Sequence, residues 1–151
     1  MDNSSRRSSV TFHRFNDAFE TVSRMMIPYT HHGRNHLGCD CVGLIFYIYN
    51  LAGCSIDHLD MPYSVDEGES LMVRQLIEDR LSNDFADATR AVIGGWAPPG
   101  TILLLREPGG LHLGMWANRK IYEMGCGYFR VSHEMRTGHR ILKAFALKGL
   151  S

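Results

Sequence analysis

Apolar residues from Asn16 to Ile27 recur at helical spacing, at Ala18, Phe19, Val22, Met25 and Met26. This spacing places them on one side of a helix, with the polar residues between them facing solvent. Pro28 cannot continue a helix, so the helix is predicted to end before it. The next segment, Tyr29–Gly38, is polar and rich in histidine and glycine, which predicts a loop.

The segment from Cys41 to Gly53 is apolar on almost every side. A helix of this composition is buried all round, and either Asp40 or Cys39 is expected to cap its amino end. A further helix is predicted from Glu67 to Leu81, with an apolar stripe at Leu71, Met72, Gln75 and Leu76.

The second half of the chain has the pattern of short strands. The turn signal Pro98–Gly100 precedes an apolar run that predicts a strand at Thr101–Leu105. Two further runs flank Asn118-Arg119, which predicts a β-hairpin. The strands expected after the first are His112–Ala117, Lys120–Met124, Tyr128–His133 and Arg140–Leu147. Helices followed by antiparallel strands indicate an α+β domain.

The 151 residues suffice for one domain and not for two separate cores. We expect a single domain at residues 13–151, after a Ser- and Arg-rich segment, residues 1–12, that is flexible or docked on a partner. The 16 basic and 16 acidic residues cancel, so charge gives no reason to expect binding to nucleic acid. No apolar run approaches the roughly 18 residues that cross a bilayer, so no membrane insertion is expected.

Cys41 stands in the first turn of the predicted buried helix. There the positive end of the helix dipole favours a thiolate, which is the nucleophilic form of cysteine. Cys39 lies in the loop before the helix, and Cys54 lies beyond its other end. The alternative is that Cys41 is a small buried apolar residue, as most free cysteines are.

His112 follows a Pro-Gly-Gly-Leu turn and begins a predicted strand. Its imidazole can therefore project from the strand end and serve as a general base. A lone histidine is more often structural, and it is the pairing with Cys41 that makes His112 a catalytic candidate.

The loop before the buried helix also admits a zinc site, because ligand-type residues are dense there: His31, His32, His36, Cys39 and Cys41. Zinc sites, however, combine a pair such as C-x-x-C or H-x-x-x-H with a second matching half, and no pair with a second matching half appears here. We therefore expect no metal.

Three short motifs of the chain are informative when they are taken together. They are Gly38–Leu44, which reads Gly-Cys-Asp-Cys-Val-Gly-Leu, then Pro99–Thr101, and then His112–Trp116, which reads His-Leu-Gly-Met-Trp. Together they resemble the NlpC-type (NlpC/p-sixty) cell-wall cysteine peptidases, which have Asp-Cys-Ser-Gly-Leu, Pro-Gly-Asp and His-Val-Gly-Ile-Tyr there. The loop Tyr29–Arg34 and the tail from Arg140 are most similar to the phage and gene-transfer-agent branch of that family.

The resemblance implies a papain-like fold in which Cys41 is the nucleophile and His112 is the base. It implies hydrolysis of peptidoglycan stem peptides, at the bond from D-γ-glutamate to the diamino acid, without a cofactor. Other residues expected around the pair are Tyr29 and Asp40 beside it, and His32 and Arg34 as candidates in the substrate loop.

In this family a third polar residue orients the imidazole and stands twelve residues after the histidine, whereas this chain has Glu123 at eleven. A two-residue turn at Asn118-Arg119 makes Gly114 face Glu123. Because His112 and Gly114 share one face of their strand, Glu123 is placed diagonally from His112. We therefore expect Glu123 to be the third catalytic residue, the alternative being a surface salt bridge.

The first fifteen residues contain two arginines but no apolar stretch, so no secretory signal is predicted, and the cysteines are expected as reduced thiols. The chain is expected to be made in the cytoplasm and carried to the cell wall as part of a phage or gene-transfer-agent tail. Two alternatives stay open. One is an amidase or acyltransferase on the same fold, and the other is a tail assembly protein with a vestigial peptidase fold.

Overall fold

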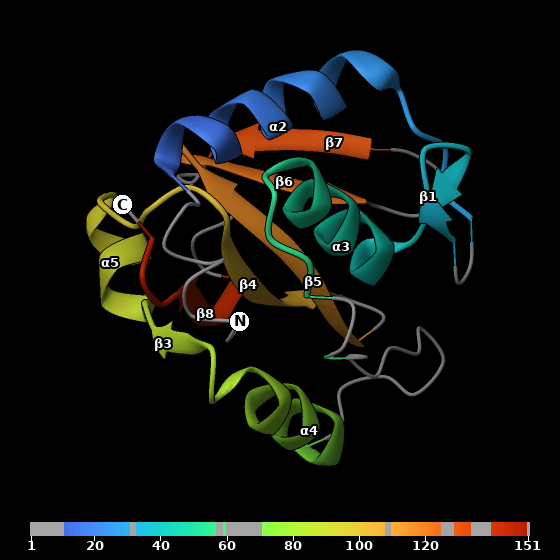
Figure 1. Cartoon of the computed structure of the whole chain (residues 1–151). Coiled ribbons are helices and arrows are strands. Elements are labelled where there is room, and N and C mark those ends of the chain that lie inside the picture. Colours follow the sequence, from blue (N-terminus) through green and yellow to red (C-terminus); the bar gives the residue numbers. More distant parts are fainter. Residues whose placement is uncertain are drawn as a thin grey trace, which may run out of the picture.

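The computed structural model describes residues 11–30, 33–56, 59, 71–107, 110–124, 129–133 and 140–150. The described helices are α2 (Phe12–Met25), α3 (Cys41–Leu51), α4 (Leu71–Leu81) and α5 (Thr89–Gly94), shown in Figure 1. The described strands are β1 (Arg34–Asn35), β2 (Gly38–Cys39), β3 (Phe85–Asp87), β4 (Thr101–Glu107), β5 (Gly110–Ala117), β6 (Lys120–Met124), β7 (Phe129–His133) and β8 (Ile141–Leu147).

Six of these strands form one antiparallel sheet in the order β3-β8-β4-β5-β6-β7. Strands β4 to β7 are neighbours in chain order, whereas β8 returns to pair between β4 and β3. β1 and β2 form a separate two-stranded ladder directly before α3. Helices packed on an antiparallel sheet confirm the predicted α+β class.

The alternation of side chains along the strands gives the sheet two apolar faces. Consecutive residues of β4 show this, because Ile102 and Leu104 belong to the core on the α2 and α3 side, while Leu103 and Leu105 belong to the core under α5. Figure 1 shows α2 and α3 against one side of the sheet and α5 on the other. The sheet is therefore covered on both sides around its central strands.

Helix α3 lies against the central strands and is buried along almost its whole length, from Cys41 to Tyr49. Its N-cap is Asp40, whose Oδ1 accepts a hydrogen bond of 2.8 Å from the amide of Gly43. A cap of this kind stabilises a helix by about 1 kcal/mol. In the part of the chain that the structure describes, no helix combines the length and apolar content needed to cross a membrane.

Helix α2 begins four residues before the predicted start at Asn16 and ends two residues before the predicted end at Ile27. The reason is local. Thr11 caps the helix by accepting a hydrogen bond from the amide of Arg14 at 3.2 Å, and Met26 stops it by adopting a left-handed conformation. Residues 1–10 of the segment expected to be flexible or docked lie outside the described residues, and Phe12 is already helical.

Helix α4 confirms the predicted helix over Leu71–Leu81, while residues 67–70 lie outside the described part. The predicted apolar stripe was partly wrong, because Gln75 is exposed and hydrogen bonds Asp79. Among its described side chains, the helix buries Ile77 and Leu81.

The hairpin of β5 and β6 has the register that the sequence predicts. Ala117 pairs with Lys120 across the two-residue turn, and both turn residues have positive φ, 52° at Asn118 and 63° at Arg119. A turn with two left-handed residues matches the twist of the strands it joins. The turn length therefore fixes which residues of β6 lie beside those of β5.

Candidate active site

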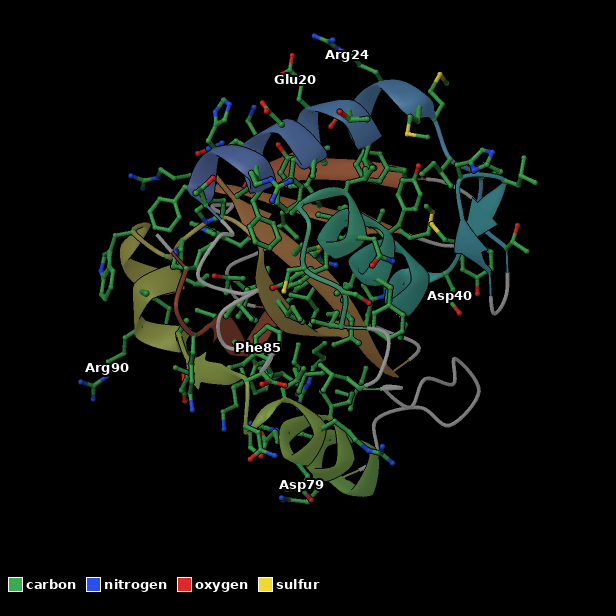
Figure 2. The ribbon with its side chains drawn as sticks, in the orientation of Figure 1. Glu20, Arg24, Asp40, Asp79, Phe85 and Arg90 are labelled. Carbon is green, nitrogen blue, oxygen red and sulfur yellow. The ribbon has the colours of Figure 1, made fainter. Side chains whose placement is uncertain are left out.

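Cys41 is the first residue of α3, directly after the capping residue Asp40. Figure 2 shows Asp40 at the amino end of this helix, beside the short ladder of β1 and β2. Cys39, Cys41 and Cys54 are 0%, 1% and 7% exposed, so exposure does not single out Cys41, whereas its position does. Of the three, it is the one at the amino end of a helix, where the dipole favours negative charge. All three are free thiols, as predicted.

The backbone of the loop before α3 is fixed against the helix. Pro28 and Thr30 exchange hydrogen bonds with Cys39, at 3.1 Å each, and the amide of Asp40 donates to Gly33 at 3.4 Å. A Cβ atom at Gly43 would lie 2.0 Å from the carbonyl oxygen of Gly33, so the close approach of loop and helix requires glycine there. The loop therefore holds the residues next to Cys41 in one arrangement.

Among the other residues predicted around the pair, Tyr29 is half-buried and forms a backbone bridge with Cys39, two residues before Cys41. The backbone of Arg34 pairs with Cys39 in the β1–β2 ladder. The side chain of Arg34 and all of His32 lie outside what the structure describes.

His112 lies near the start of β5, and its side chain is 11% exposed. Its partner across the sheet is Leu105 of β4. At Leu105 the pairing of β4 with β8 shifts register, and such a bulge bends the strand and increases its local twist. His112 therefore lies on β5 opposite the point at which the neighbouring strand, β4, is distorted.

Glu123 of β6 is fully buried, and its Oε1 lies 3.4 Å from Nε2 of His112. The predicted alternative, a surface salt bridge, is wrong because the carboxylate has no exposure to solvent. Within the described residues Nε2 makes no hydrogen bond of good geometry, so the contact at this separation is an ion pair. A Cβ atom at Gly114 would be tight against Leu105 Cδ1, at 3.0 Å, and in ordinary contact with Glu123 Cβ, at 3.6 Å.

The side chain of His112 also interacts with that of Cys41. Burial by itself would lower the pKa of the imidazole, but the contacts with Cys41 and Glu123 and the negative charges of both groups raise it to about 10. A histidine of this kind is an imidazolium at neutral pH. Because Nε2 faces Glu123, Nδ1 is the nitrogen left for the thiol. The structure thus brings together Cys41, His112 and Glu123, from α3, β5 and β6.

Sequence reasoning missed Arg140, which directly precedes β8. Its Nη2 donates a hydrogen bond of 3.0 Å to Oε2 of Glu123. The sequence carries no local signal for this contact, because Glu123 lies on β6 and Arg140 lies just before β8, and these two strands are not neighbours in the sheet.

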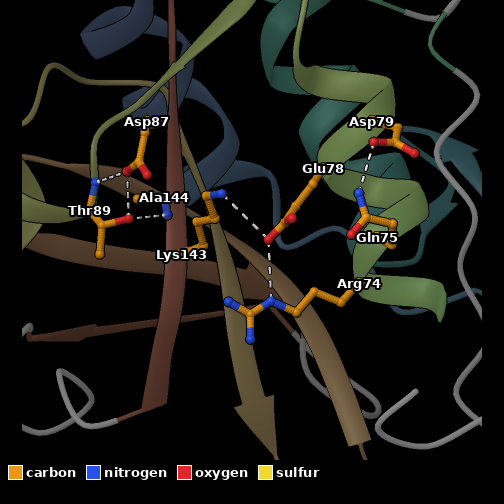
Figure 3. Close-up of polar contacts among 8 residues, drawn as sticks. All are labelled: Arg74, Gln75, Glu78, Asp79, Asp87, Thr89, Lys143 and Ala144. Atoms are coloured by element: carbon orange, nitrogen blue, oxygen red, sulfur yellow. Dashed lines mark hydrogen bonds and ion pairs between the residues drawn. The ribbon is translucent and has the colours of Figure 1, made fainter. Parts of the chain in front are cut away.

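A pocket with a volume of about 640 Å³ lies between α4, α5 and β8, and none of the three site residues lines it. Figure 3 shows the polar contacts around it. Asp87 accepts hydrogen bonds from the amide and hydroxyl of Thr89, and Glu78 pairs with both Arg74 and Lys143. The charged groups at this pocket are therefore largely engaged with one another.

The part of the chain that the structure describes contains no group of three or more histidine, cysteine, aspartate or glutamate side chains placed to hold a metal ion. Among the described loop residues, His36, Cys39 and Cys41 do not form such a group, and His31 and His32 lie outside the described part.

No protein-family model matches the sequence, and no curated protein matches it either. The chemistry of the site is accordingly the basis for assigning a function.

Proposed function

We propose that this protein is a cysteine peptidase of the papain-like, NlpC type that hydrolyses peptidoglycan stem peptides. The observation that carries the proposal is the interaction of His112 with both Cys41, at a helix amino end, and the buried Glu123. Thiol, imidazole and orienting acid in this order are the parts of a nucleophilic triad.

In the proposed reaction the pair reacts as thiolate and imidazolium. The thiolate of Cys41 attacks the amide carbonyl, and the carbonyl electrons move to oxygen, where amide groups of the first turn of α3 stabilise the charge. The tetrahedral intermediate collapses, the C–N bond breaks, and His112 gives its proton to the leaving amine. His112 then takes a proton from water, whose oxygen attacks the thioester and releases the acid and the thiolate.

The choice of substrate rests on the resemblance of Gly38–Leu44 and His112–Trp116 to the NlpC-type peptidases. The same resemblance supports cleavage between D-γ-glutamate and the diamino acid. An amidase or acyltransferase would share the thioester, and would differ in whether water or an added amine resolves it.

The test is to incubate the purified chain with muropeptides and to follow new amino groups together with product masses. We expect a product pair from cleavage after D-γ-glutamate. Treatment with iodoacetamide near neutral pH should stop the release, with the carbamidomethyl group found on Cys41 before Cys39, Cys54 or Cys126. A small reagent is needed because Cys41 is only 1% exposed.

Two outcomes would contradict the peptidase. One is a failure to release amines from any muropeptide. The other is alkylation of Cys39 first while hydrolysis continues. Products that carry an added amine instead of a new carboxylate would support the acyltransferase.

We place the enzyme in a phage or gene-transfer-agent tail, on the similarity of Tyr29–Arg34 to that branch of the family. Residues 1–10 are the proposed anchor, because they have too little apolar content to fold alone. Deleting residues 1–10 keeps Thr11, the N-cap of α2. The truncated chain should hydrolyse soluble muropeptides normally and be missing from purified particles. Truncated chain that still purifies with particles would place the anchor elsewhere.

A further inference from the structure

Glu123 is a buried carboxylate held between two cationic side chains that approach different oxygens. Nε2 of His112 lies 3.4 Å from Oε1, and Nη2 of Arg140 lies 3.0 Å from Oε2. Glu123 has no exposed surface, and Arg140 is 16% exposed. The charges therefore interact in a region that water screens little.

The two contacts on Glu123 differ in quality. The arginine contact meets the geometric criteria of a hydrogen bond, while the histidine contact is an ion pair at longer range. The last torsion of a glutamate side chain is broad and poorly fixed by its own rotamer preference. The tighter contact therefore sets the plane of the carboxylate, and the other oxygen is directed at the imidazole as a result.

Both cationic side chains, His112 and Arg140, favour the ionised form of Glu123. A buried carboxylate with one partner is costly, and a second cation reduces that cost. The groups that act on His112 are Cys41 from α3 and Glu123 from β6. With Arg140 the cluster contains two cations and two anions when the catalytic pair is ionised.

We propose that Arg140 is a positioning residue of this active site, which fixes the orientation and ionisation of Glu123 and through it the orientation of His112. The catalytic role of Arg140 rests on the proposed peptidase function. The arrangement of charges around Glu123 does not depend on that function.

The test compares Arg140→Met, which removes the charge, with Arg140→Lys, which keeps a charge but loses the planar guanidinium. Arg24→Met is the matched control, because Arg24 pairs with Glu20 on the exposed surface of α2. Figure 2 shows this pair on the outside of the molecule. Three quantities are measured for each chain: the pH titration of the His112 ring by NMR, the rate of Cys41 alkylation against pH, and kcat and KM on muropeptides.

We expect Arg140→Met to lower the pKa of His112 and to shift the pH profile of alkylation, while kcat falls about 10²-fold and KM changes little. Arg140→Lys should recover part of each effect, and Arg24→Met should match the wild type. A folded Arg140→Met chain with the His112 titration of the wild type would overturn the inference. If that variant does not fold, an Arg140→Lys chain identical to the wild type in all three measurements would overturn it too.

The titration and the alkylation do not depend on hydrolysis. A wild-type chain that cleaves no muropeptide would therefore contradict the peptidase, while the His112 titration would still decide whether Arg140 positions the acid.

Discussion

Replacing Cys41 by alanine is expected to lower kcat/KM for muropeptide hydrolysis by about 10⁴-fold or more. In the proposed mechanism the sulfur forms the bond to the substrate, so its removal eliminates the thioester step and leaves only what binding and the oxyanion donors contribute. The change takes place at a fully enclosed position of α3 and removes one atom, so the fold should persist. Amine release from muropeptides and circular dichroism of both chains measure the two effects.

Cys54→Ala is the matched control for this experiment. Cys54 is also a buried free thiol, but it lies after the carboxyl end of α3, away from the amino end where Cys41 stands. It should keep the wild-type rate. Loss of activity in Cys54→Ala together with retained activity in Cys41→Ala would show that the nucleophile is not Cys41.

The His112 imidazole should stay protonated far above neutral pH and lose its proton only near pH 10. An ordinary histidine titrates at about 6.5, so the expected displacement is large and easy to resolve by NMR of the ring protons. Removing either of the two groups that raise the pKa of His112 should bring it down, and Cys41→Ala and Glu123→Gln are the chains to compare. A ring that titrates near 6.5 in the wild type would show that the two side chains do not act on it.

The raised pKa of His112 also predicts how the stability of the fold changes with pH. The folded state binds this proton more tightly than the unfolded state, so the histidine, taken alone, stabilises the fold fully below about pH 6.5. That contribution is lost as the pH rises through about 10. The free energy of unfolding, measured in urea between these values, should therefore decline more steeply for the wild type than for His112→Asn.

The parts of the site that the sequence predicts correctly are those fixed by local rules. Asp40 at the end of a polar loop and an apolar run after it define a capped, buried helix. Two residues between two strand patterns define a tight turn, and the turn defines the register that puts Glu123 beside His112. Each of these inferences needs only a few consecutive residues.

The parts that the sequence does not predict depend on distant segments. Strand β3 and helix α5 are short, and their place in the fold comes from pairing with β8 and packing on the sheet. Arg140 reaches Glu123 across the fold, and no rule of residue spacing predicts this contact. Trp96 follows the end of α5 and is 72% exposed, whereas Trp116 is buried in the core under α5.

The hairpin turn between β5 and β6 also decides where this chain can change in length. One residue inserted in β6 before Glu123 would exchange the two sides of the strand and turn the carboxylate away from His112. One residue inserted in the turn would be taken up as a three-residue loop with a bulge, and the pairing beyond it would be unchanged. The acid would then stand twelve residues after the histidine, as in the family that the chain resembles. Insertions should therefore be tolerated in this turn. The position of the proposed orienting acid can be predicted by counting residues from the histidine only when the length of the turn is known.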